Sequence, residues 1–295
     1  MVRLAVAQYD LQRPEDWSRY ADRVAGWVAD GARRGGELLV FPEYAGLELG
    51  GFCLSDRRLT PRRLYPAMQP RIRDAIGLHR QLAREHGVVI VAGSMPVAVG
   101  DGRFCNRVHV FGPQGDDGCQ DKIQLTRLEH RTELMAAGAG LHVFDTGGLG
   151  FGIALCYDSQ FPLLGHAMAE AGADLILSPS CTHAATGFNR VRIGCRGRAL
   201  ENQCYTAQAP LIGEAAWFPL MAANVGRAGI FTPPDEGVPD DGILADAEDD
   251  APGWLLADLD PATLQYLRSH GQVGNAGDWA AQHRALTSPV TRITL

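Results

Sequence analysis

Lysine is almost absent from this sequence. Of its 27 basic residues, 26 are arginine, and Lys122 is the only lysine. Arginine therefore supplies the surface cations, whereas lysine differs from it as a compact point charge with three rotatable donors. Lys122 thus either occupies a functional position where a guanidinium group could not replace the ammonium, or is a surface lysine retained by chance.

Closely spaced cysteine pairs are also missing. None of the seven cysteines is spaced as CxxC, which argues against a zinc site or a redox pair. The cysteine count is odd, the chain is large and nothing directs export. We therefore expect free thiols, a reducing cytoplasm and no bound metal.

Long apolar runs and a basic stripe are absent as well. Without an apolar run of about 18 residues the sequence predicts no membrane span, and its strand-like beginning predicts no signal peptide. The net charge of −7 argues against a nucleic-acid partner. With 295 residues, 46% of them hydrophobic, the chain can bury a large core without disulfides or metals.

What the chain does contain is an alternation of helical and strand-like segments. Buried-type strands alternating with helices favour an α/β layered domain over residues 1–270. The expected helices span 14–34, 67–86, 161–171, 188–202 and 261–269. The expected strands include 3–9, 38–42, 88–92, 103–111, 143–145, 150–155, 175–179, 204–209, 229–232 and 254–258.

Other segments show no clear period. Residues 45–66 and 213–228 are interpreted as loops and 235–250 as an acidic surface excursion. Residues 271–295 are expected to form a C-terminal arm, a candidate for a subunit interface. A short echo links 171–179 with 34–42, each with a glycine, an acid, an apolar strand and a proline. Two α-β halves stacked through their sheets would explain this echo.

Three polar groups stand at or near the ends of apolar segments. Cys156 ends a strand just before a helical pattern, Glu43 follows the strand that closes with Pro42, and Lys122 lies in a strand or loop. At strand ends these groups can converge on one mouth. Each also has an ordinary interpretation, as a buried cysteine, a capping or paired acid and a solvated lysine.

Together the three groups predict hydrolysis of an amide. A thiolate attacks the carbonyl carbon, and a lysine beside the backbone N–H after the cysteine stabilises the oxyanion. A carboxylate takes the thiol proton, passes it to the departing amine and later activates water. No histidine, the usual partner of a catalytic cysteine, stands at a strand end near these groups.

The order of these motifs resembles the nitrilase, or carbon–nitrogen hydrolase, superfamily. The resemblance runs from Leu4 to about Leu259. It rests on a strand ending Phe-Pro-Glu, a lysine in Asp-Lys-Ile-x-Leu, and Cys-Tyr-Asp before a helix, together with Leu-Ile-Leu-Ser-Pro-Ser at 175–180 and Arg-Ala-Leu-Glu-Asn at 198–202. It implies a four-layer α-β-β-α sandwich, cofactor-free catalysis and a homodimer or larger homo-oligomer.

The resemblance also implies roles for individual residues. Glu43 would be general base and acid, Lys122 the electrostatic stabiliser and Cys156 the nucleophile. Many members have a second glutamate near the lysine, for which Glu129 is the best match and Glu133 the alternative. Cys-Tyr-Asp, where nitrilases usually have Cys-Trp-Glu, looks like the amidase and carbamoylase branches.

Other residues are candidates for the substrate pocket. Tyr44 and Tyr157 flank the proposed catalytic groups, and Cys181, Thr182 and His183 follow a strand end. Four arginines at 190, 192, 196 and 198 stud one predicted helix, where they either bind a substrate carboxylate or form a solvated or interface surface. Trp217-Phe218-Pro219 lies in a loop that covers the site or packs at a subunit contact.

These observations leave three functional hypotheses. The first is hydrolysis of a small linear amide or N-carbamoyl compound through a cysteine thioester, with release of ammonia or an amine. The second is nitrile hydrolysis or acyl transfer with the same triad. The third is a non-catalytic binding or scaffold protein, against which the intact triad argues because such a protein does not need these three groups together.

Overall fold

The computed structural model describes residues 1–294, apart from the side chains of 283 and 284. Its strands are β1 (Val2–Asp10), β2 (Leu38–Val40), β3 (Val89–Val91), β4 (Met95–Gly100), β5 (Arg103–Phe111), β6 (Asp117–Asp121), β7 (Val143–Asp145), β8 (Gly150–Ile153), β9 (Leu175–Ser180), β10 (Tyr205–Glu214), β11 (Ala223–Asn224), β12 (Gly229–Phe231), β13 (Ile243–Asp246) and β14 (Gly253–Leu259). Its helices are α1 (Trp17–Arg33), α2 (Pro61–His86), α3 (Arg127–Thr132), α4 (Pro162–Glu170), α5 (Ala185–Asn202), α6 (Pro261–His270) and α7 (Asn275–Leu286), with 3-10 turns η1 (Ala45–Gly50), η2 (Cys156–Gln160) and η3 (Pro219–Met221).

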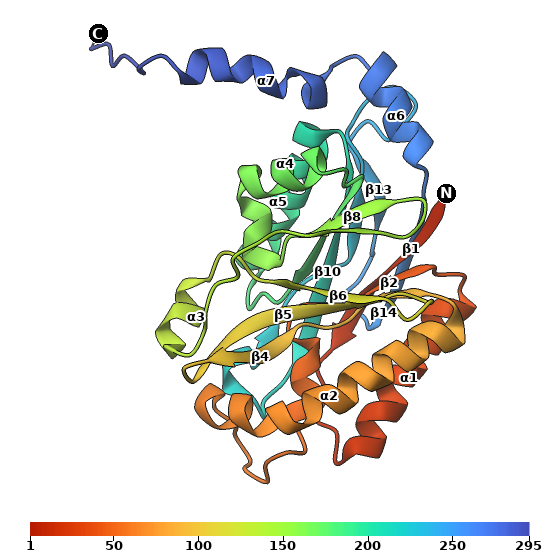
Figure 1. Cartoon of the computed structure of the whole chain (residues 1–295), viewed down its shortest axis with the longest axis vertical. Helices are drawn as coiled ribbons and strands as arrows, with labels where there is room; N and C mark the ends of the chain where they lie inside the picture. Colours follow the sequence, from red (N-terminus) through yellow and green to blue (C-terminus); the bar gives the residue numbers. More distant parts are fainter. Residues whose placement is uncertain (295) are drawn as a thin grey trace.

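The strands form one continuous sheet that is divided, at a short seam between β1 and β10, into two halves, here called the first and the second sheet. Their order is β4-β5-β3-β2-β1-β10-β9-β8-β7, with β14 antiparallel to β1 and β12 antiparallel to β10. Strands β1 and β10 pair only where Tyr9 meets Leu211 and Asp10 meets Ile212. Figure 1 shows α1 and α2 on the outside of the first sheet and α4 and α5 on the outside of the second.

The two sheets bury their facing side chains against each other. Because side chains alternate across a strand, Leu4 and Val6 of β1 point to one face and Ala5 and Ala7 to the other. Leu4 and Val6 join Leu175 of β9 in one cluster, whereas Ala5 and Ala7 belong to the cluster that includes residues of α1 and α2. A strand that is apolar throughout is therefore buried on both faces.

The outer face of the second sheet is covered in the same way. Ile176 of β9 clusters with Met168 of α4, and Phe231 of β12 clusters with Val191 and Cys195 of α5. The layers therefore run helix, sheet, sheet, helix, which confirms the predicted four-layer α-β-β-α sandwich. The two echoing stretches form β2 and β9, one in each sheet.

The interpretation of residues 45–66 as a loop is confirmed for 51–60 and wrong for the two ends of that range. Residues Ala45–Gly50 form the buried turn η1, and α2 begins at Pro61 rather than at 67. Proline is well suited to a first helical position, because its missing N–H would have no partner there. The arginines that suggested a loop lie around a buried stripe that includes Leu64, Tyr65 and Met68.

The segments expected to be irregular also contain regular structure. Within 235–250, Ile243–Asp246 form β13, which pairs antiparallel with β12. Strand β10 continues to Glu214, and η3 and β11 occupy part of 213–228. Strand β4 and helix α3 were not expected.

The C-terminal segment contains helix α7, which Figure 1 shows passing along the end of the molecule that carries α4, α5 and α6. The ring of Trp279 stacks on His166 of α4 at 3.8 Å between centroids, and its Nε1 donates to the carbonyl of Glu201 at 2.8 Å. The division into a domain at 1–270 and an arm at 271–295 stays a prediction. Among the described residues, no helix combines the length and apolarity needed to cross a membrane.

Candidate active site

Cys156 lies at the turn from β8 into η2, as the sequence predicts. Its φ of 46° is in the left-handed region, which is uncommon for a residue other than glycine. The turn is held by the Ser159 hydroxyl, which donates to the Cys156 carbonyl at 2.6 Å. Helix α5 passes closely behind it at Gly194, where a Cβ atom would lie 2.8 Å from the Ser159 carbonyl oxygen. The sharp turn therefore depends on its surroundings.

Glu43 is buried three residues after the end of β2, and both of its carboxylate oxygens have partners. Oε1 accepts from Lys122 Nζ at 2.7 Å and from Asn106 Nδ2 at 2.9 Å. Oε2 accepts from the backbone N–H of Cys181 at 2.9 Å. Since β2 and β9 belong to different sheets, this carboxylate links the ends of two strands across the sandwich.

Lys122 follows β6 and is 1% exposed. Besides its bond to Glu43, its ammonium donates to both oxygens of Glu129 at 2.9 Å. A buried ammonium needs such pairing because its desolvation is expensive. The sole lysine of the chain is therefore held between two carboxylates, and the interpretation of Lys122 as a solvated surface residue is wrong.

Glu129 is fixed by the start of helix α3. Thr126 caps this helix: its hydroxyl accepts from the Glu129 backbone N–H at 3.2 Å, and Glu129 Oε2 accepts from the Thr126 backbone N–H at 2.8 Å. This reciprocal arrangement is a capping box. The hydroxyl of Tyr44 also donates to Glu129 Oε1, at 2.7 Å. The carboxylate is thus positioned by two independent elements.

The pKa values of the two glutamates move in opposite directions. Burial raises the pKa of Glu43 above its ordinary value, even though Lys122 opposes that shift. Burial also acts on Glu129, but Lys122 and the Tyr44 hydroxyl outweigh it and lower the pKa of that carboxyl. The carboxylates raise the pKa of Lys122 well above its usual range despite burial. Of the two acids, Glu43 is therefore the better suited to exchange a proton.

The surroundings of Cys156 favour the protonated form of its thiol. Burial, with the neighbouring Glu43 carboxylate, raises the pKa of this thiol well above its ordinary value, and Lys122 only partly offsets the effect. Cys156 Sγ lies 3.7 Å from the carbonyl oxygen of Cys181. A thiol in this state needs a base to become a nucleophile, and the raised pKa of Glu43 suits that task.

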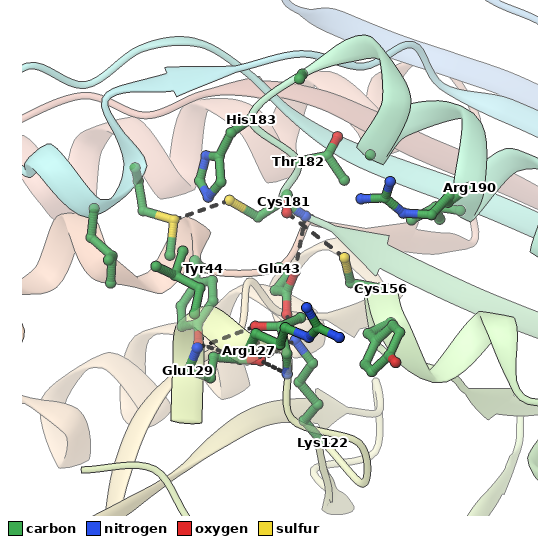
Figure 2. Close-up of a pocket in the computed structure, with 18 of the residues that line it drawn as sticks. Glu43, Tyr44, Lys122, Arg127, Glu129, Cys156, Cys181, Thr182, His183 and Arg190 are labelled. Atoms are coloured by element: carbon green, nitrogen blue, oxygen red, sulfur yellow. Dashed lines mark hydrogen bonds and ion pairs between the residues drawn. The ribbon is translucent and has the colours of Figure 1, made fainter. Parts of the chain in front are cut away.

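A cavity of about 570 Å³ opens over these groups (Figure 2). All nine predicted site residues line it: Glu43, Tyr44, Lys122, Glu129, Cys156, Tyr157, Cys181, Thr182 and His183. Glu133 does not line it, because it ends α3 and pairs with Arg62 at 3.1 Å on the surface. The structure thus brings the predicted residues together, while their roles stay predictions.

Sequence reasoning missed several residues of the site. Asn106 of β5 donates to Glu43, and Asp158 accepts from the backbone N–H groups of Ile123 and Gln124 at 3.1 and 2.6 Å. Tyr65 of α2 also lines the cavity. One usable signal was Asn106 itself, an amide in the alternating series whose other members, Phe104, Val108 and Val110, are apolar.

Comparison with curated proteins finds relatives along most of the chain. The chain is 30% identical over 277 residues to "Probable hydrolase YhcX" of Bacillus subtilis, which covers 94% of this chain and 53% of that relative. The chain thus spans about half the length of this relative. It is 27% identical to the omega-amidase NIT2 of Danio rerio, over 90% of this chain and 89% of the relative.

Solved structures show the same fold. An amidase mutant of Nesterenkonia sp. AN1 superposes with a TM-score of 0.74 at 23% identity, over 97% of this chain and 100% of the other. In that structure acrylamide has added to the active-site cysteine of the amidase. Residues 3–268 of our chain match the family described as Carbon-nitrogen hydrolase. The chain therefore belongs to the carbon–nitrogen hydrolase family.

Proposed function

We propose that this protein hydrolyses the C–N bond of a small linear amide or N-carbamoyl compound through a thioester on Cys156. The observation that carries the proposal is the position of Glu43. One of its oxygens accepts from Lys122 at 2.7 Å and the other from the Cys181 N–H at 2.9 Å, beside the Cys156 thiol. A base, a cation and a nucleophile thus share one cavity.

In the first half of the reaction Glu43 takes the proton of the Cys156 thiol as sulfur attacks the amide carbon. The carbonyl π electrons move to oxygen, where the Lys122 ammonium and the backbone N–H of Tyr157 stabilise the negative charge. The oxyanion then re-forms the carbonyl and the C–N bond breaks. Glu43 gives its proton to the departing nitrogen, so ammonia or an amine leaves and a thioester remains.

In the second half Glu43 removes a proton from water, and the hydroxide oxygen attacks the thioester carbon. The same cation and backbone N–H stabilise the second oxyanion. Its collapse breaks the C–S bond, and the proton held by Glu43 returns to the thiolate of Cys156. The acid product leaves, and the site regains its starting protonation state.

Glu129 serves as a positioning residue in this scheme. Both of its oxygens lie 2.9 Å from the Lys122 ammonium, and its bonds to Tyr44 and Thr126 fix its own orientation. Holding the cation in place before the reaction avoids reorganisation while the oxyanion forms.

The names of the relatives support amides as the substrate class, because an amidase and omega-amidases are among them. Nitrile hydrolysis and acyl transfer would use the same three groups. The remaining candidate pocket residues, Tyr157, Cys181, Thr182 and His183, are proposed to contact the substrate beyond the reacting carbon.

A homodimer or larger homo-oligomer is also part of the proposal. Helices α4 and α5 expose large apolar side chains, with Leu163 72% and Ile193 71% exposed. Exposed apolar side chains of this size are typical of contact surfaces when they gather in a patch. We propose a cytoplasmic location as well, supported by seven cysteines that are all free thiols.

The direct test is ammonia release from a panel of small amides, ω-amides, N-carbamoyl compounds and nitriles. We expect release from at least one amide or carbamoyl compound, and none from the Cys156→Ala variant. Release from nitriles alone would assign the site to nitrile hydrolysis. Release that persists in Cys156→Ala would overturn the proposed nucleophile.

A further inference from the structure

The mouth of the cavity carries two arginines that have no partner in the described part of the chain. Arg127 begins α3 and Arg190 lies on α5, and both line the cavity that holds Cys156. Neither guanidinium group forms an ion pair or hydrogen bond with a described residue, and both residues are exposed. Figure 2 shows both guanidinium groups facing the space around Cys156.

The other arginines of α5 are used structurally. Nη1 and Nη2 of Arg192 donate to the carboxylate of Asp246 in β13 at 2.9 and 2.5 Å. Nε and Nη2 of Arg198 donate to the carboxylate of Glu201 at 2.8 Å each. Arg196 donates to the carbonyl of Asp241 at 2.7 Å. Of the four arginines on this helix, Arg190 lines the cavity, and its guanidinium group is the one that has no partner among the described residues.

The charge around the cavity favours an anion at its mouth. Glu43 and Glu129 are the acidic residues among its lining, and both are bonded to the Lys122 ammonium at its base. No lining carboxylate therefore remains to neutralise Arg127 and Arg190. The chain as a whole has a net charge of −7, whereas these two unpaired arginines make the mouth of the cavity locally positive.

We propose that Arg127 and Arg190 form an anion subsite, so that the preferred substrate is an amide whose acyl chain ends in a carboxylate. Guanidinium groups bind carboxylates through parallel N–H bonds, and two of them on different helices would also fix the direction of the acyl chain. This inference rests on the proposed hydrolase function and extends it to the class of substrate.

Binding to the inactive Cys156→Ala protein tests the subsite without turnover. Isothermal calorimetry compares the monoamides of butanedioic and pentanedioic acid with butyramide, which lacks the carboxylate. We expect at least one monoamide acid to bind about tenfold or more tightly than butyramide, since hydrogen bonds to charged groups contribute that much or more. The preference should weaken as ionic strength rises.

Variants in the same Cys156→Ala background then assign the preference to the two arginines. Arg127→Gln and Arg190→Gln should each reduce the ratio of the two affinities about tenfold, and Arg190→Lys should reduce it less because the charge remains. The matched control is Arg131→Gln, an exposed arginine of α3 that does not line the cavity, which should preserve the ratio.

The outcomes separate this inference from the proposed function. Equal binding of all three compounds, or a ratio that Arg127→Gln and Arg190→Gln leave unchanged, would overturn the anion subsite even if the enzyme releases ammonia from neutral amides. A carboxylate preference that depends on both arginines, in a protein that releases no ammonia from any amide, would retain the subsite and reject the hydrolase.

Discussion

The carboxylate of Asp158 accepts a hydrogen bond of 2.6 Å from the backbone N–H of Gln124. Asp158 lies two residues after Cys156, and Gln124 lies two residues after Lys122. The Asp158 carboxylate also accepts from the backbone N–H of Ile123, at 3.1 Å. A single buried side chain therefore ties the turn of the proposed nucleophile to the segment that carries the lysine.

This link predicts the effect of Asp158→Asn. An asparagine offers one carbonyl oxygen, so its amide nitrogen would face a backbone donor and leave it unpaired. The lysine and the thiol would shift relative to each other, and misplacement of about 1 Å can cost roughly 100-fold in rate. We expect kcat to fall at least tenfold with little change in KM, measured by ammonia release.

The matched control is Asp145→Asn at the end of β7. Asp145 also accepts from a backbone N–H, that of Gly147 at 2.7 Å, but it is exposed and does not line the active-site cavity. This variant should keep the wild-type kcat. An Asp158→Asn enzyme with wild-type kcat would show that the link has no positioning role.

Lys122→Arg should keep the charge and lose turnover. The ammonium lies within 2.9 Å of three carboxylate oxygens in a site where the lysine is 1% exposed, and a planar guanidinium is too large for that space. Loss of a preorganised oxyanion stabiliser typically costs about 100- to 1,000-fold in kcat. Steady-state kinetics would measure this loss, with thermal unfolding as a check on folding. A variant that hydrolyses amides at the wild-type rate would contradict the role given to Lys122.

Glu48 predicts a pH dependence of stability away from the cavity. It is fully buried in η1, and burial raises its pKa to about 7, although Arg23 opposes the shift. The folded protein therefore binds more protons than the unfolded chain between about pH 4 and pH 7. Its contribution to the free energy of unfolding is consequently present at low pH and lost as pH rises through about 7.

Urea unfolding of wild type and Glu48→Gln at pH 5 and pH 7.5 measures this contribution. Glutamine has no such proton equilibrium, so the stability of wild type relative to the variant should rise by about 1–3 kcal/mol on going to pH 5. The contributions of all other titrating groups cancel when the free energy of unfolding of the variant is subtracted from that of wild type at each pH. A difference that is the same at both pH values would show that Glu48 does not titrate in this range.

The groups at strand ends could be predicted from sequence because their chemistry and their position were both visible. Glu43 and Cys156 follow apolar runs, and Lys122 is conspicuous as the sole lysine. The layered fold was also predictable, because strands that are apolar on both faces must be covered on both sides.

Residues that act through tertiary contacts were not predictable in this way. Tyr65 was missed because proline and arginine in the first turns of α2 suggested a loop, although Pro61 suits a helix start. Asp158 bonds to a segment 34 and 35 residues away, and local pattern carries no information about such a pairing. Sequence likewise could not separate Arg190 from Arg192, because their partners on other elements distinguish them.

The central claim is that an acyl group is attached to Cys156 during turnover. Rapid acid quench during hydrolysis of a substrate found in the ammonia-release panel, followed by intact-protein and peptide mass spectrometry, tests it directly. The account predicts an adduct with the mass of the substrate less ammonia or the departing amine, located on Cys156 and absent from Cys156→Ala. Ammonia release without any adduct, even at the shortest quench times and with Glu43→Gln used to slow thioester hydrolysis, would contradict it.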